Sequence, residues 1–188
     1  MIAAVVVSVL LRIRFVFAPV GTDEGGYLAI ARAWRHGADL YHDVWVDRPQ
    51  GLLLLFRAYD TVIGPVGLVR LLSLLFGAVA VVAVAWGVRA AAGAPAGTAA
   101  ALLVAAMSAS PVIEGFQANG ELLSGAMSAV AVALACGVFT GRLAERWMFA
   151  VGVAGALGWS LKQSGVDGLA AVTLFLLLAA VLHWESWT

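Results

Sequence analysis

Long apolar runs alternate with short polar segments along most of the chain. The runs lie at about Ile2–Phe17, Val66–Val88, Pro95–Ser108, Leu122–Phe139, Trp147–Leu161 and Gly168–Leu182. A helix needs about 20 apolar residues to cross the hydrocarbon core, and several of these runs are shorter, which places their polar flanks inside a protein cavity. The pattern predicts an all-α, polytopic membrane protein with about six transmembrane helices.

A long mixed stretch separates the first two apolar runs and predicts a first extracytoplasmic loop over residues 18–63. Within it, Glu24–His36 has the spacing of an amphipathic helix, and Gly37 is a typical C-terminal stop. A second apolar helix is predicted over Gln50–Ile63, directly after Pro49. We expect both helices to lie along the membrane surface, and the whole chain, 1–188, to form a single transmembrane module.

Composition narrows the classes of function. Apolar residues make up 63% of the chain, charged residues only 12%, and the formal net charge is zero, so nothing indicates a nucleic-acid partner. A signal peptide is a poor explanation of the N-terminus, because Arg12 and Arg14 come late in its apolar run. The single cysteine, Cys136, excludes an internal disulfide.

The connections between the apolar runs predict an orientation. Arg89, Arg142 and Arg146 fall on one side, and the positive-inside rule places that side in the cytoplasm. All acidic residues except Glu145 and Glu185 fall on the other side. We therefore expect a multi-pass protein of the plasma (inner) membrane whose chemically active face is extracytoplasmic.

The stretch TDEGGYLAIARAW places Asp23 and Glu24 together where the first amphipathic helix begins. One interpretation is structural: Asp is a favoured N-cap, and Glu in the first turn suits the helix dipole. The other is chemical, because a carboxylate at the edge of a membrane cavity can act as a general base. The two interpretations are compatible, since a capping carboxylate can also face a substrate.

Three further polar segments fall on the same side of the membrane. Asp47 and Arg48 precede Pro49, and they form either an ordinary surface ion pair or an acid and a base presented together. The segment Glu114–Glu121 is either a loop turning at Asn119–Gly120 or a polar cavity wall that includes Glu121. The only lysine, Lys162, is followed by Gln163; it either snorkels to the interface or holds a phosphate.

The charged residues within the first apolar run also have either a structural or a functional role. Arg12 and Arg14 are costly in a membrane and often functional there, but with a two-residue spacing at most one can face a cavity. No metal signature is present, because the histidines lack ligand spacing to one another or to cysteine; they are His36, His42 and His183.

Taken together, these segments resemble the C-type membrane glycosyltransferases, in particular the protein mannosyltransferase and aminoarabinose transferase branch. The resemblance rests on Asp23-Glu24 with Tyr27 three residues later, on Asp47-Arg48-Pro49-Gln50, and on Leu161-Lys162-Gln163, in that order along the chain. An arginine near the outer end of the first span, Arg12 or Arg14 here, is also similar to the family. Arg48 and Gln50 depart from the commoner Lys and Pro.

The resemblance implies an inverting transfer of a sugar from a polyprenyl-phosphate donor to an acceptor glycan, lipid or protein at the outer face of the membrane. It implies that Asp23 is the general base with Glu24 assisting, and that Tyr27 lines the cavity. The residues expected to bind substrate are Asp47, Arg48, Glu121, Lys162 and Gln163, together with Arg12 or Arg14.

Family members are longer, so the chain is expected to be the N-terminal portion of a larger enzyme. A divalent cation is compatible with the carboxylate cluster but not required by it. Two other classes of function stay open: a transporter or flippase of a lipid-linked or polar solute, and a non-catalytic membrane scaffold whose first-loop helices bind a partner.

Overall fold

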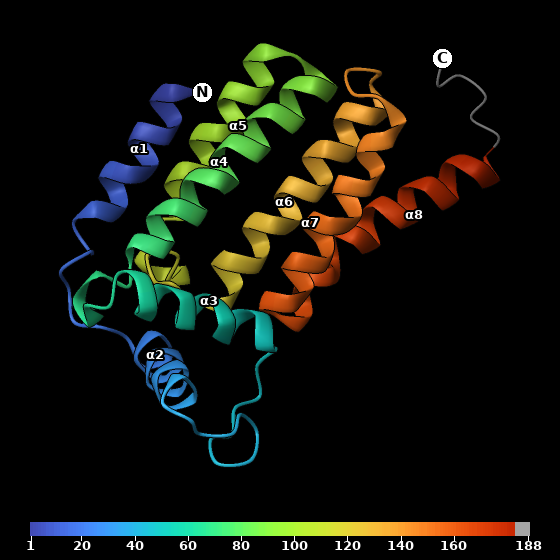
Figure 1. Ribbon diagram of the computed structural model, residues 1–188. Coiled ribbons are helices and arrows are strands. Elements are labelled where there is room, and N and C mark those ends of the chain that lie inside the picture. Colours follow the sequence, from blue (N-terminus) through green and yellow to red (C-terminus); the bar gives the residue numbers. More distant parts are fainter. Residues whose placement is uncertain (183–188) are drawn as a thin grey trace.

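The computed structural model describes residues 1–182, which are built of helices joined by short connections (Figure 1). In chain order the helices are α1 (Ile2–Ile13), α2 (Thr22–Arg35), α3 (Gln50–Val62), α4 (Leu71–Ala92), α5 (Ala94–Met107), α6 (Gly120–Phe139), α7 (Met148–Leu161) and α8 (Asp167–Val181). Single turns of 3₁₀ helix lie between them, at Val66–Leu68, Pro111–Ile113, Glu145–Trp147 and Gln163–Val166. Residues 1–182 contain no strand, which confirms the all-α prediction.

Within residues 1–182, three helical segments are long and apolar enough to cross a membrane: Val66–Ala92, Gly120–Phe139 and Gln163–Val181. Helices α1 and α5 are shorter apolar helices. Each predicted apolar run contains a helix, but the first ends at Ile13 rather than Phe17, because the backbone turns there with Phe15 N–H donating to Arg12 O. These segments are consistent with a membrane protein.

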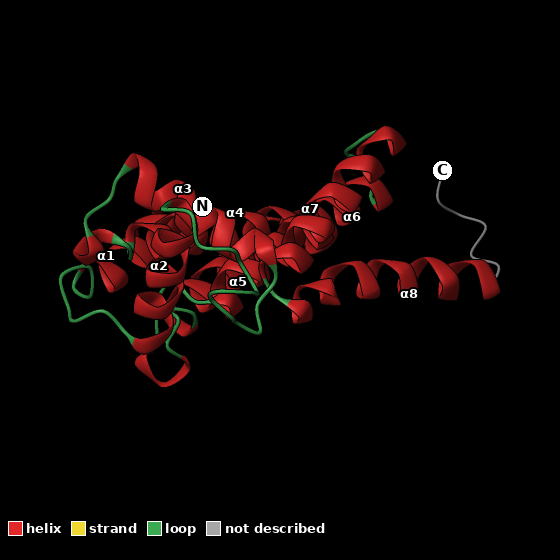
Figure 2. Cartoon of the chain, turned by 60° about the horizontal axis from the view of Figure 1, so that its bottom comes forward, coloured by secondary structure: helices red, strands yellow, loops and turns green. Residues whose placement is uncertain are grey.

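The apolar helices lie side by side, and the chain reverses direction from each to the next through α4, α5, α6 and α7 (Figure 1). Helix α6 packs between α4 and α7, and α1 packs against α4 and α5. Helix α3 crosses one end of this bundle with α2 beyond it, and the connections after α5 and α7 reach the same end. Helix α8 leaves the bundle at an angle, as Figure 2 also shows.

The two helices of the first loop form as the sequence predicts, within two residues at each end. Gly37 has φ of 103°, which confirms it as the stop after α2. The inner face of α3 presents Leu52, Leu53 and Phe56, all fully buried, to α2 and to the ends of the bundle helices. Full burial of such a side chain contributes about 1.5–3 kcal/mol, so this apolar face holds α3 across the bundle.

Small residues allow the bundle helices to approach closely. A Cβ atom added to Gly87 in α4 would lie 2.9 Å from the Cα of Ala133 in α6. Small residues at helix interfaces are typical of membrane proteins, where close backbone contact replaces the hydrophobic driving force. The contact between α4 and α6 therefore depends on the absence of a side chain at Gly87.

We expect Gly87→Val to lower the free energy of unfolding by about 1–3 kcal/mol, because its side chain must displace the α6 backbone. Gly152→Val is the matched control, since nothing lies within 4 Å of the corresponding Cβ position. Thermal denaturation in detergent, followed by circular dichroism, measures both variants. Equal midpoints for the two variants would contradict a tight α4–α6 contact at this point.

Candidate functional site

Asp23 and Glu24, the adjacent acidic residues at the start of α2, have different roles. The N-cap of the helix is Gly21, with φ of −71° and ψ of 166°, so the interpretation of Asp23 as the N-cap, one of the two left open, is wrong. Instead the carboxylate of Glu24 accepts a hydrogen bond from the Gly21 N–H at 3.1 Å. Glu24 therefore caps the helix, and the exposed Asp23 has no capping role.

Glu24 is fully buried and forms an ion pair with Arg70, whose side chain is only 3% exposed. Arg70 Nε lies 3.0 Å from Glu24 Oε2 and 3.2 Å from Oε1. Oε1 also accepts from the Ala118 backbone N–H at 2.7 Å. Glu24 thus joins α2 to the start of α4 and to the connection before α6, and it does not face solvent.

Arg70 extends this junction to the segment between α1 and α2. Its Nη1 donates to Phe15 O at 2.7 Å and to Ala18 O at 3.3 Å, and its Nη2 donates to Pro19 O at 2.7 Å. Arg70 is not among the site residues predicted from the sequence. The signal was available, because an arginine inside the apolar run Val66–Val88 is costly unless it has partners.

Asp23 lies at one end of a chain of polar side chains. The Tyr27 hydroxyl donates to Asp23 Oδ2 at 3.3 Å and accepts from Arg48 Nε at 3.0 Å. Arg48 Nη1 in turn lies 2.9 Å from Asp47 Oδ2, which confirms the predicted ion pair. The structure therefore brings two segments of the first loop together, α2 and the end of the connection before α3.

The environment of Tyr27 keeps its phenol neutral. Burial raises the pKa of Tyr27, and the charge and hydrogen bond of Asp23 raise it further, against the opposing effect of Arg48. The hydrogen bond to Tyr27 raises the pKa of Arg48. At neutral pH Tyr27 therefore keeps its proton and donates a hydrogen bond to Asp23, while Arg48 stays cationic.

Two residues that follow α7 and one at the start of α6 complete this polar network. Lys162 Nζ forms an ion pair with Glu121 Oε1, and Gln163 Nε2 donates to Asp47 O at 3.3 Å. Asn119 caps α6 by accepting from the Leu122 N–H at 2.9 Å, so the turn expected at Asn119–Gly120 is instead a helix start. Hence Asp23, Tyr27, Asp47, Arg48, Glu121, Lys162 and Gln163 meet at one end of the bundle.

A pocket of about 370 Å³ adjoins this network at Glu121. It lies between α4, α6 and the connection that follows α5. Most of its lining is small or apolar, with polar groups from Ser108, Asn119 and Glu121. Such a lining suits a ligand that has an apolar part and a few hydrogen-bonding groups.

The two arginines of the first apolar run lie outside the network. Arg12 is 1% exposed and donates from Nη2 to Ser108 O at 2.8 Å and from Nε to Gly115 O at 3.2 Å, so it connects α1 to the end of α5. Gly77 leaves room for it, since a Cβ there would lie 2.8 Å from the guanidinium carbon. Arg14 is exposed and stacks on Phe15. Neither guanidinium contacts a residue of the polar network.

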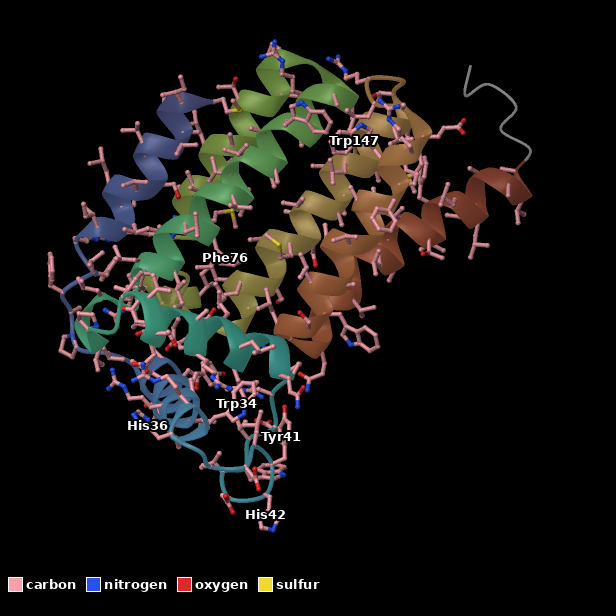
Figure 3. All side chains as sticks on the ribbon, in the orientation of Figure 1. Trp34, His36, Tyr41, His42, Phe76 and Trp147 are labelled. Atoms are coloured by element: carbon pink, nitrogen blue, oxygen red, sulfur yellow. The ribbon has the colours of Figure 1, made fainter. Side chains whose placement is uncertain are left out.

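The first loop also gathers three potential metal ligands. Asp39, His42 and Asp43 each bring a ligand atom within 4.8 Å of the others. Their side chains are exposed at the far tip of the loop, where Figure 3 labels His42. His42 Nδ1 lies 2.8 Å from Asp43 Oδ1, so the group partly satisfies itself, and we assign it no metal. His183 and Glu185 lie outside the described residues.

The arrangement provides the parts of a group transfer to a hydroxyl. Asp23 is an exposed carboxylate oriented by a neutral phenol, and a carboxylate in reach of a hydroxyl can remove its proton. Arg48 and Lys162 supply positive charge on the same polar network, which suits a phosphate. Because each cation already has an acidic neighbour, a phosphate has to compete with Asp47 or Glu121 for it.

We expect Arg70→Met to cost about 3–5 kcal/mol of unfolding free energy, because it leaves the buried Glu24 carboxylate without its counter-ion. The double variant Glu24→Gln with Arg70→Met removes both charges and should be less destabilised than Arg70→Met alone. Arg14→Met is the matched control at an exposed arginine. Thermal denaturation in detergent measures the loss of stability in each variant. A loss for Arg70→Met that is no greater than the loss for Arg14→Met contradicts the prediction.

The tyrosines give a pH prediction. The pKa values of Tyr27, Tyr41 and Tyr59 are raised above their ordinary value of 10.0, in each case chiefly by burial. The unfolded chain therefore loses these protons first, so the contribution of these tyrosines to the free energy of unfolding is constant below pH 10 and falls as pH rises through the raised values. We expect phenolate absorbance to appear at higher pH in the native chain than in denatured chain, and Tyr27→Phe to reduce that difference. Coinciding titration curves would contradict the burial of Tyr27 and Tyr59.

Comparison with known proteins leaves the site to be interpreted from its own geometry. No protein-family model, curated protein or solved structure matches the chain. The chemistry inferred for the site therefore depends on the polar network described above and on the motifs that contribute to it.

Proposed function

We propose that the chain is an inverting glycosyltransferase that moves a sugar from a polyprenyl-phosphate donor to an acceptor at the outer face of the plasma (inner) membrane. The observation that carries the proposal is the polar network. Motifs that lie far apart in the sequence, represented by Asp23, Arg48 and Lys162, join it at one end of an apolar helical bundle. A helical scaffold alone does not require them to meet.

The proposed topology has six transmembrane helices, namely α1, α4, α5, α6, α7 and α8. It is supported by the reversal of direction from each of α4 to α7 to the next, and by the charges at the two ends (Figure 1). Arg89, Arg142 and Arg146 lie at or beyond the ends of helices opposite the polar network, which the positive-inside rule assigns to the cytoplasm. Residues 18–63 and the network then lie on the extracytoplasmic side.

In the proposed reaction Asp23 accepts the proton of an acceptor hydroxyl as its oxygen attacks the anomeric carbon. The bond from that carbon to the donor phosphate breaks, and the configuration inverts. The leaving phosphate takes the electron pair and thereby gains a further negative charge, so it requires cations more than a general acid. Arg48 and Lys162 provide those cations, and Gln163 is placed to hold the phosphate or sugar.

The other network residues have supporting roles. Tyr27 orients Asp23, and Asp47 orients Arg48. Glu121 is the counter-ion of Lys162 before the donor binds, and the pocket beside it accommodates an apolar part of a substrate. Glu24, fully buried against Arg70, assists Asp23 by fixing the start of α2 and not by touching substrate. The acceptor is a glycan, lipid or protein hydroxyl.

The test is sugar transfer in membranes that contain the native-length protein, supplied with labelled polyprenyl-phosphate sugars. We expect Asp23→Asn to lower the rate by at least about 100-fold, the usual contribution of a general base. Asp39→Asn is the matched control, because Asp39 is an exposed carboxylate of the same loop without a contact to the polar network. Membrane insertion of all proteins is measured in parallel.

The possible outcomes separate the functions. Loss of transfer in Asp23→Asn alone supports the proposal, and equal rates for parent and Asp23→Asn remove Asp23 from the base role. A parent that inserts normally, transfers none of several sugars and yet passes a lipid-linked or polar solute across vesicles is a transporter.

A further inference from the structure

A group of arginines at the seam between α2 and α3 takes no part in the polar network around Asp23. Arg32 and Arg35 come from the last turn of α2, and Arg57 comes from the middle of α3. We call these three residues the arginine surface. Asp60 is the acidic residue paired with them, so the arginine surface carries an excess of two positive charges.

Asp60 occupies only part of the bonding capacity of these arginines. Its carboxylate is 1% exposed; Oδ1 accepts from Arg32 Nε at 2.7 Å, and Oδ2 lies 3.1 Å from Arg35 Nη2. Arg32 also donates to Gly64 O at 2.8 Å. The side chains of Arg32 and Arg35 are nevertheless 39% and 35% exposed, so their remaining N–H groups are accessible from outside.

Arg57 is fixed in place without an acidic partner. Its guanidinium lies 4.6 Å from the centroid of the Trp34 ring, and Figure 3 places Trp34 at the end of the bundle away from Trp147. Among residues 1–182, its guanidinium has no hydrogen bond or ion pair. A cation–π contact orients the plane of an arginine but leaves its N–H donors free. Those donors suit an anion that can accept two parallel hydrogen bonds through two of its oxygens, such as a phosphate.

The adjoining face of α3 is apolar and exposed. Leu54 and Val62 are 51% and 82% exposed, and Ala58 lies exposed between them. These three residues stand at positions i, i+4 and i+8, so they share one face of α3. Arg57 borders this face on the side that is nearer to Asp60, and Asp60 faces α2. A helix with an exposed apolar stripe bordered by arginines is typical of a segment lying in the membrane interface.

We propose that the arginine surface binds the phosphate headgroup of an anionic phospholipid while the apolar stripe of α3 contacts its acyl chains. The excess positive charge favours anionic over zwitterionic lipids, and the apolar stripe favours a lipid over a soluble anion. Bound lipid holds α2 and α3 at the interface. The inference goes beyond the proposed sugar transfer and does not depend on it.

The test uses the full chain in a non-ionic detergent, with bound lipids counted by native mass spectrometry. The probes are dioleoyl phosphatidylglycerol and dioleoyl phosphatidylcholine, which share acyl chains and differ in headgroup charge. We expect the parent to retain phosphatidylglycerol preferentially. Arg35→Gln with Arg57→Gln should weaken its retention about 30-fold, since each arginine near an anionic surface contributes about a factor of five.

The matched control is Arg142→Gln with Arg146→Gln, which removes two exposed arginines between α6 and α7, leaves the arginine surface and the apolar stripe of α3 intact, and should weaken retention much less. Arg57→Gln alone loses a contact with the Trp34 ring and nothing buried, so it tests the site if the double variant fails to fold. Equal retention of the two lipids by the parent overturns the proposal. So does a loss in the control pair as large as in the test pair, or an Arg57→Gln variant that matches the parent.

Discussion

The buried ion pair between Glu24 and Arg70 is the interaction on which the functional end of the molecule depends. It joins segments that are distant in the sequence: the start of α2, the start of α4 and the connection before α6. A buried charge is tolerated only when its partner and hydrogen bonds are complete, so the pair forms only when all of these segments are in position. Arg70 satisfies this demand by donating also to three carbonyls that precede α2.

The direction of Asp23 follows from this pair. Successive residues on a helix point about 100° apart, so once Glu24 faces inward to Arg70, Asp23 faces outward. It thereby reaches Tyr27, one turn along the same helix, and through Tyr27 the guanidinium of Arg48. The adjacent acids thus have different roles: Glu24 fixes the helix, and Asp23 is presented to solvent.

The same rule governs the other charges that enter the apolar part of the molecule. Arg12 is buried, and its N–H groups are taken by hydroxyls and carbonyls of α1 and of the segment around Ser108. Asp60 is buried between Arg32 and Arg35. These buried charges are held by ion pairs and hydrogen bonds, although Asp60 Oδ2 has no hydrogen bond within residues 1–182. The accessible charges, such as Asp23 and Arg57, are available to ligands.

The sequence by itself determined the all-helical class, the positions of the helices and the presence of α2 and α3 in the first loop. It could do so because apolar runs, a Gly stop at Gly37 and helical spacing are local signals. It also selected residues that the fold brings together, including Asp23 and Lys162, since ionisable groups are rare enough in this chain to stand out.

Only the tertiary structure decided which charge faces where. The sequence does not distinguish Asp23 from Glu24, nor Arg12 from Arg14, because both members of each pair have the same local pattern. Which member of each pair is buried depends on partners that are distant in the sequence. Arg70 is 46 residues from Glu24, and Ser108 is 96 residues from Arg12. Burial and charge pairing are properties of these long-range contacts, and they exist only once the helices have packed.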